Sequence, residues 1–177
     1  MAGDSSSRMP EQPTVVVLMG VSGCGKTAVG RLVARDLGWT FHDADDFHPP
    51  DNVERMRQGI PLTDAERWPW LDAVRRFIDN AAGERRGVVI ACSALARRYR
   101  DRLGLPDPRV RLVHLDGPPE LIRRRLEERI GHFMPASLLE SQIALLERPS
   151  VDENAAVIDI AAAPAAIAGR IAAIVRP

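Results

Sequence analysis

The 177-residue chain has little cysteine, no net charge and no long apolar run. Its two cysteines, Cys24 and Cys92, form neither a disulfide framework nor a metal-binding spacing, which is typical of proteins from a reducing compartment. The 24 basic and 24 acidic residues cancel, so no overall field favours nucleic acid or an anionic membrane surface. Charged residues interrupt every apolar segment before it reaches the length of a membrane span. These absences argue against a nucleic-acid-binding, membrane or disulfide-stapled protein.

A chain of this length suits a single domain with a core of its own. The first 13 residues are polar, contain three consecutive serines and two prolines, and lack the apolar stretch of a signal peptide. We therefore expect residues 1–13 to be a disordered tail and residues 14–177 to form one domain.

Segments rich in valine and isoleucine alternate with segments of helical periodicity, which indicates repeated β-α-β units. The near-continuous apolar character of 15–19 and 88–91 suits parallel strands covered by helices on both faces. The pattern predicts an α/β fold of three layers, with a five-stranded parallel sheet between two layers of helices. The predicted strands are 14–19, 40–43, 87–92, 110–116 and 156–160, and the predicted helices are 26–37, 64–82, 119–130, 135–146 and 164–175.

A glycine-rich segment, GVSGCGKT, follows the first predicted strand and opens the first predicted helix, which is the layout of a Walker A phosphate-binding loop. Glycines allow backbone N–H groups to approach phosphate oxygens, and the helix adds its positive N-terminal end. Lys26 would reach the terminal phosphates, and Thr27 would offer its hydroxyl to Mg²⁺. The alternative is a glycine-rich turn without a ligand. The nucleotide-binding residues predicted here are Gly20, Val21, Ser22, Gly23, Cys24, Gly25, Lys26 and Thr27.

Ligands bind beyond the carboxyl ends of strands in an open parallel sheet, so the residues that follow each strand are candidates for the site. Asp43 and Asp45 follow the second predicted strand. Their carboxylates could hold a water on Mg²⁺ and accept a proton from an attacking hydroxyl, or they could cap the next helix.

Two arginine clusters follow the third and fourth predicted strands. Arg97, Arg98 and Arg100 could hold a carboxylate or phosphate in a bidentate grip, or form a solvated helix face. Arg125 and Arg129 lie one helical turn apart, so they could close over the phosphates as part of a lid, or they could be ordinary surface residues.

Together these clusters resemble the gluconokinase family, small kinases that phosphorylate D-gluconate on its C6 hydroxyl with ATP and Mg²⁺. The resemblance runs from the phosphate loop almost to Pro149. Besides that loop it is carried by Asp43-Ala44-Asp45, His48-Pro49, Pro69-Trp70-Leu71, Cys92-Ser93-Ala94-Leu95, Tyr99-Arg100-Asp101, Arg129 with His132-Phe133-Met134, and Ser141-Gln142.

The resemblance implies a P-loop NTPase-type fold like that of shikimate and adenylate kinases, with a helical lid over about residues 119–147. It also implies a cytoplasmic protein, a homodimer in many members, and a place before the pentose phosphate route. The roles implied are catalysis by Lys26, Asp45 and Arg129; phosphate contacts from Arg125 and Arg129; Mg²⁺ at Thr27 and Asp43; and substrate contacts from Asp45, His48, Arg67, Arg98, His132 and Gln142.

One departure concerns Ala96, which stands where the family commonly has lysine, so Arg97 or Arg98 would supply that cation. Two other functions stay open at this point. Another small-molecule kinase, acting on shikimate or a nucleoside monophosphate, would share the loop and the lid. An ATP-binding sensor would bind nucleotide without transferring phosphate.

Overall fold

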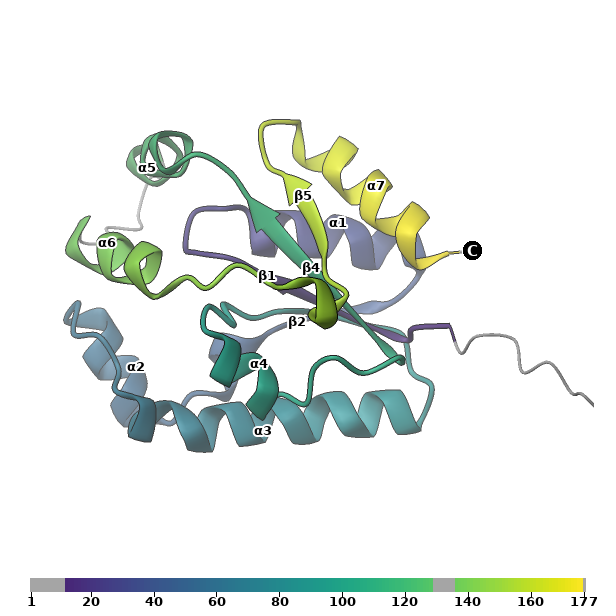
Figure 1. The fold of residues 1–177 in the computed structure, drawn as a ribbon, viewed down its shortest axis with the longest axis horizontal. Coiled ribbons are helices and arrows are strands. Elements are labelled where there is room, and N and C mark those ends of the chain that lie inside the picture. The colour runs from purple at the N-terminus through teal and green to yellow at the C-terminus, as the bar shows by residue number, and fades with distance from the viewer. Residues whose placement is uncertain (1–11, 129–135, 177) are drawn as a thin grey trace, which may run out of the picture.

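A computed structural model of the protein describes residues 12–128 and 136–176, which form a five-stranded sheet with helices on both faces (Figure 1). The strands pair in the order β2-β3-β1-β4-β5, and every pairing is parallel. This arrangement confirms the predicted α/β fold. The strands are β1 (Val15–Met19), β2 (Thr40–Asp43), β3 (Val88–Ala91), β4 (Val110–Asp116) and β5 (Ala156–Asp159).

Two apolar cores lie on the two faces of the sheet, one beneath α3 and α4 and the other beneath α1 and α7. Helices α5 and α6, here called the lid helices, follow β4 and lie together beyond its carboxyl end (Figure 1). The helices are α1 (Lys26–Leu37), α2 (Pro50–Arg57), α3 (Asp64–Gly83), α4 (Arg97–Arg102), α5 (Pro119–Glu127), α6 (Ala136–Leu145) and α7 (Pro164–Val175), with short 3-10 helices η1 (Ala44–Phe47) and η2 (Val151–Glu153).

The central strand β1 shows why the sheet forms as it does. All five of its residues are buried, and their side chains alternate between the two cores. Val15 and Val17 pack toward α3 and α4, whereas Val16 and Leu18 pack toward α1 and α7. A strand that is apolar at every position fits only the centre of a sheet covered on both sides. It carries the phosphate loop at its carboxyl end.

The described elements match the predicted ones closely, and the clearest difference is α2. Neither α2 nor the short helix α4 was among the predicted helices. Pro50 occupies the first turn of α2. Proline has no backbone N–H, but the N–H groups of a first turn have no acceptor within the helix, so no helical hydrogen bond is lost there. No helix in the described part of the chain has both the length and the apolar character needed to cross a bilayer. The predicted tail falls largely on residues 1–11, outside the described residues, so the domain boundary stays a prediction.

Candidate active site

The loop between β1 and α1 contains three glycines with positive φ, and two of them also leave no room for a Cβ. Gly20 has φ +143°, and a Cβ there would lie 2.8 Å from the carbonyl oxygen of Leu115. Gly23 has φ +83°, and a Cβ there would lie 2.6 Å from Cγ of Leu126 on α5. Both conformations are ones that L side chains rarely adopt. The glycines therefore allow a tight bend beneath the lid helices.

Several backbone donors of this loop are unpaired. Among the described residues, the N–H groups of Gly23, Gly25, Lys26 and Thr27 have no hydrogen-bond partner. The last two belong to the first turn of α1, where helical N–H groups have no acceptor within the helix. Adjacent unpaired donors at the positive end of a helix fit a phosphate group.

The side chain of Lys26 lies back along the loop. Its Nζ donates to the carbonyl oxygens of Gly20, at 2.8 Å, and Val21, at 3.0 Å. The ammonium group is thus held beside the start of the loop, where it can reach the outer phosphates of a nucleotide.

The first predicted carboxylate, Asp43, joins the end of β2 to the start of α1. Its Oδ2 accepts a hydrogen bond from Thr27 Oγ1 at 3.3 Å, and its Oδ1 accepts one from the backbone N–H of Asp45 at 3.1 Å. Asp43 therefore caps η1 and also contacts the phosphate loop. The capping alternative drawn from the sequence is therefore realised, and the role at Mg²⁺ stays a prediction.

The second carboxylate, Asp45, lies in η1 and is exposed to solvent. Its side chain is 70% exposed, yet the protein that surrounds it raises its pKa above the ordinary value. The negative charge of Asp43 raises the pKa further, while Lys26 opposes the shift. An accessible carboxylate with a raised pKa is a stronger base than an ordinary surface aspartate.

His48 is neutral and packed beneath Asp45. Its side chain is 3% exposed, and its ring stacks on Trp70 with 4.2 Å between centroids. Burial, assisted by the positive charge of Arg67, lowers the pKa of His48 to about 4.

The hydrogen-bond partners of His48 also decide its tautomer. Asn52 Nδ2 donates to the carbonyl oxygen of Glu66 at 2.9 Å and lies 3.5 Å from His48 Nδ1. Because this amide nitrogen can only donate, Nδ1 accepts and the ring proton sits on Nε2. That Nε2 lies 3.9 Å from Asp45 Oδ1. An N–H donor and a carboxylate therefore face the same space.

Two more predicted substrate residues, Arg67 and Arg98, meet at the ring of Tyr99. Their guanidinium carbons lie 5.4 Å and 4.7 Å from the ring centroid. Arg98 also grips Asp64 with Nε to Oδ2 at 2.7 Å and Nη2 to Oδ1 at 3.2 Å, and Tyr99 donates to Asp64 at 2.5 Å. The structure thus brings Asp64 and two arginines together around Tyr99.

The remaining predicted residues lie elsewhere. Arg125 Nη2 donates to the carbonyl oxygen of Ile160 at 2.7 Å, and Gln142 Oε1 accepts from the backbone N–H of Ser22 at 2.7 Å. Arg129 and His132 lie outside the described residues.

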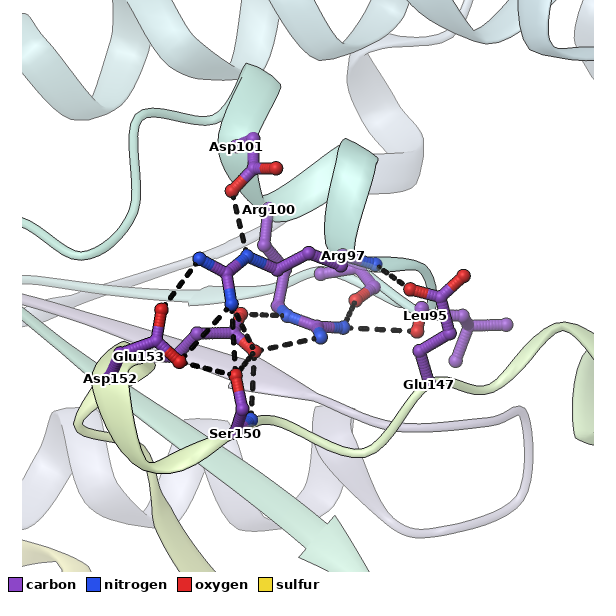
Figure 2. Close-up of polar contacts among 9 residues, drawn as sticks. Leu95, Arg97, Arg100, Asp101, Glu147, Ser150, Asp152 and Glu153 are labelled. Atoms are coloured by element: carbon purple, nitrogen blue, oxygen red, sulfur yellow. Dashed lines mark hydrogen bonds and ion pairs between the residues drawn. The ribbon is translucent and has the colours of Figure 1, made fainter.

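Arg97, one of the two arginines expected to replace a lysine, pairs with acidic residues of α4 and η2. Its guanidinium is bound to Asp101, at 3.0 Å, and to Asp152, at 2.8 Å (Figure 2). Of the two arginines, Arg98 is the one that contacts Asp64 and Tyr99.

A buried ion pair that no sequence pattern predicted holds the loop after β3. Arg100 meets Glu153 through Nε and Oε2 at 2.5 Å and through Nη2 and Oε1 at 3.1 Å (Figure 2). Its Nη1 also donates to the carbonyl oxygens of Ala94, at 2.9 Å, and Leu95, at 3.0 Å. The pair therefore holds the loop between β3 and α4, whose Ser93 carbonyl accepts from the N–H of Gly20 at 3.2 Å.

The chain after α6 is tied to the same loop. The backbone N–H of Glu147 donates to the carbonyl oxygen of Leu95 at 2.9 Å, and its Oε2 accepts from the N–H of Arg97 at 2.8 Å (Figure 2). The segment that follows α6 and the β3–α4 loop are thus connected by hydrogen bonds.

Comparisons with known proteins agree with this geometry. The family model of shikimate kinases matches residues 22–174. The chain is 46% identical to the gluconokinase of Gluconobacter oxydans over 150 residues, which cover 85% of this chain and 84% of the relative. A solved sugar kinase from Janibacter sp. is 46% identical with a TM-score of 0.85, and a gluconokinase from Sinorhizobium meliloti is 40% identical with a TM-score of 0.79. Each alignment covers 93% of this chain and 96% of the solved one. The chain belongs to the gluconokinase family of P-loop kinases.

Proposed function

We propose that this protein is a gluconokinase, which transfers the terminal phosphoryl group of ATP to the C6 hydroxyl of D-gluconate. The observation that carries the proposal is the contact between Thr27 of the phosphate loop and Asp43, with Asp45 next to it. Phosphoryl transfer needs a phosphate cradle and a nearby base for the attacking hydroxyl, and this contact joins the two. The relatives named gluconokinase supply the identity of the sugar acid.

The nucleotide site fits ATP with Mg²⁺. The unpaired loop amides and Lys26 would hold the phosphates, and the Thr27 hydroxyl and Asp43 would hold the metal, directly or through water. Bound ATP supplies the phosphoryl group, and Mg²⁺ neutralises charge as the group is transferred. No group of three or more metal-ligating side chains occurs in the described ranges, so phosphate oxygens and water would complete the coordination of Mg²⁺.

Asp45 is the proposed catalytic base. It would accept the proton of the C6 hydroxyl, since its raised pKa makes it a better proton acceptor than an ordinary aspartate. The Nε2–H of His48 faces the same space and would donate to a hydroxyl of the sugar acid.

The substrate carboxylate is proposed to bind at Arg98 and Arg67. Arg98 holds Asp64 by two hydrogen bonds, which is the geometry of an arginine binding a carboxylate. The carboxylate of gluconate would bind the Arg98 guanidinium beside Asp64 or in its place. Arg125 and Arg129 are proposed to contact the transferring phosphate, and His132 the substrate.

A substrate panel tests the proposal. ADP release by the purified protein would be measured with gluconate, shikimate, glycerate and nucleoside monophosphates, because the shikimate kinase model also matches the chain. We expect stimulation by gluconate alone, and loss of that stimulation in Lys26→Met. A higher rate with shikimate or a nucleotide would assign another kinase activity. Binding of ATP with no stimulation by any acceptor would assign a sensor.

A cytoplasmic location and a homodimeric assembly follow from the resemblance to the family, and we propose both for this protein. Size-exclusion chromatography with light scattering would measure the subunit number directly.

A further inference from the structure

Gln142 of lid helix α6 contacts the phosphate loop, and its hydrogen bond there involves neither Arg98 nor His48, the proposed substrate ligands. Its Oε1 accepts a hydrogen bond from the backbone N–H of Ser22, with 2.7 Å between the two atoms. The residues are 120 positions apart in the sequence, so the fold alone brings them together.

The partner of this carboxamide fixes its orientation. A backbone N–H group can only donate, so the oxygen of the carboxamide, and not its nitrogen, faces Ser22. The Nε2 group of Gln142 therefore keeps two N–H donors, and neither has a hydrogen-bond partner in the part of the chain that the structure describes.

The surroundings of the carboxamide suit an anion. Gly23, the next residue of the loop, presents an N–H group without a partner among residues 12–128 and 136–176, and so does Gly25. Phosphate oxygens accept from several donors at once, and hydrogen bonds to a charged group are stronger than neutral ones. Gln142 adds two neutral donors to this set.

The position of Lys26 indicates which phosphate of a bound nucleotide would lie closest to Gln142. Its Nζ is held by the carbonyl oxygens of Gly20 and Val21, directly before Ser22 in the loop. The lysine of such a loop serves the outer phosphates of a nucleotide. Ser22 and the carboxamide bound to it therefore lie toward the terminal phosphate rather than toward the base.

We propose that Gln142 donates from Nε2 to the terminal phosphate of bound ATP while Oε1 stays on the N–H of Ser22. The residue then distinguishes ATP from ADP, and it couples the position of α6 to the presence of the phosphate that is transferred. This role differs from the contact with gluconate that the sequence suggested for Gln142.

The inference rests on the proposed function only in taking ATP as the nucleotide, so its test needs no gluconate. Isothermal titration calorimetry would measure binding of the Mg²⁺ complexes of a non-hydrolysable ATP analogue and of ADP. Gln142→Met keeps the length and helix propensity of the side chain but removes both polar groups. Gln142→Glu keeps an acceptor for Ser22, removes the donors and adds a negative charge. Glu140→Gln, on the same helix, breaks an exposed ion pair with Arg123 and is the matched control.

We expect Gln142→Met to bind the ATP analogue about tenfold to a hundredfold more weakly than the wild type, with unchanged affinity for ADP. Gln142→Glu should lose at least as much affinity for the ATP analogue. It provides the test if Gln142→Met does not fold. Glu140→Gln should match the wild type. Equal losses for both nucleotides, or unchanged or tighter binding of the analogue by Gln142→Met, would overturn the inference. Wild-type protein that binds neither nucleotide would overturn the proposed function as well.

Discussion

Arg100 and Glu153 form a bidentate ion pair in which each side chain is only 1% exposed. Burial by itself would raise the pKa of Glu153, but hydrogen bonds from Arg100 and from the backbone N–H of Ser150 outweigh it and hold the pKa below its usual value. The same guanidinium binds the carbonyl oxygens of Ala94 and Leu95. A single buried arginine thus connects the segment before β5 to the loop that borders the phosphate site.

Removing one partner of this pair should destabilise the protein strongly. Glu153→Gln keeps the size of the side chain but leaves the Arg100 charge buried without a counter-ion, which typically costs about 3–5 kcal/mol of unfolding free energy. Urea denaturation followed by circular dichroism would measure the loss. Asp152→Asn, at a carboxylate that is 64% exposed beside Arg97, is the control and should destabilise far less. Equal effects of the two substitutions would contradict the importance of the buried pair.

Asp45→Asn should remove the proposed base without disturbing the nucleotide site. We expect kcat with gluconate to fall about 10²–10⁴-fold, because proton transfer by a positioned side chain contributes that much, while the affinity for the ATP analogue changes little. Steady-state kinetics and calorimetry would separate the two effects. Asp51→Asn, an exposed aspartate of α2, should leave kcat unchanged. A near-normal rate in Asp45→Asn would exclude this residue as the base.

The acid limb of the pH profile should report the pKa of Asp45. Its pKa is raised, so kcat/KM should fall with decreasing pH at a higher pH than an ordinary aspartate would give. Asp46 contributes to this shift through its negative charge. Asp46→Asn should therefore move the acid limb to lower pH, with little change in kcat at neutral pH. A limb that stays in place, or moves to higher pH, would contradict the assignment.

His48 should make the stability of the protein depend on pH between 6.5 and about 4. In this window the unfolded chain binds a proton on the histidine and the folded protein does not, so the contribution is complete above pH 6.5 and is lost as the pH falls toward 4. The shift corresponds to at most about 3 kcal/mol of unfolding free energy. His48→Phe keeps a ring to stack on Trp70 and removes the titration.

The unfolding free energy of the wild type should therefore fall relative to that of His48→Phe as the pH is lowered through this window. Chemical denaturation at a series of pH values would measure the difference between them. A difference that does not vary with pH would show that His48 binds its proton equally well in the folded and unfolded states.

The features predictable from the sequence were those that neighbouring residues determine. The apolar run 15–19 and the glycines that follow it specify a buried strand and a tight bend through local chemistry, and the structure has both. Asp43 was placed at the site because parallel strands end at one edge of a sheet, and its contact with Thr27 follows from that topology. Helix α2 was missed although a proline in its first turn, Pro50, is a usual start signal.

The features that could not be predicted depend on contacts between distant segments. Arg100 and Glu153 are 53 residues apart, and no local pattern marks an arginine that will be buried beside a carboxylate. For Gln142 the family resemblance suggested the site, but which ligand it serves depends on how α6 packs over the loop that contains Ser22.

The position of the transferred phosphate tests the central claim most directly. Purified protein would be incubated with ATP, Mg²⁺ and gluconate, and the product examined by proton-coupled phosphorus NMR. We expect a phosphate monoester split by the two protons of a terminal CH₂ group, as attack by the C6 hydroxyl requires, and no such signal from Asp45→Asn in the same time. Inorganic phosphate alone, or an ester coupled to a single proton, would show that the site does not phosphorylate the terminal hydroxyl of gluconate.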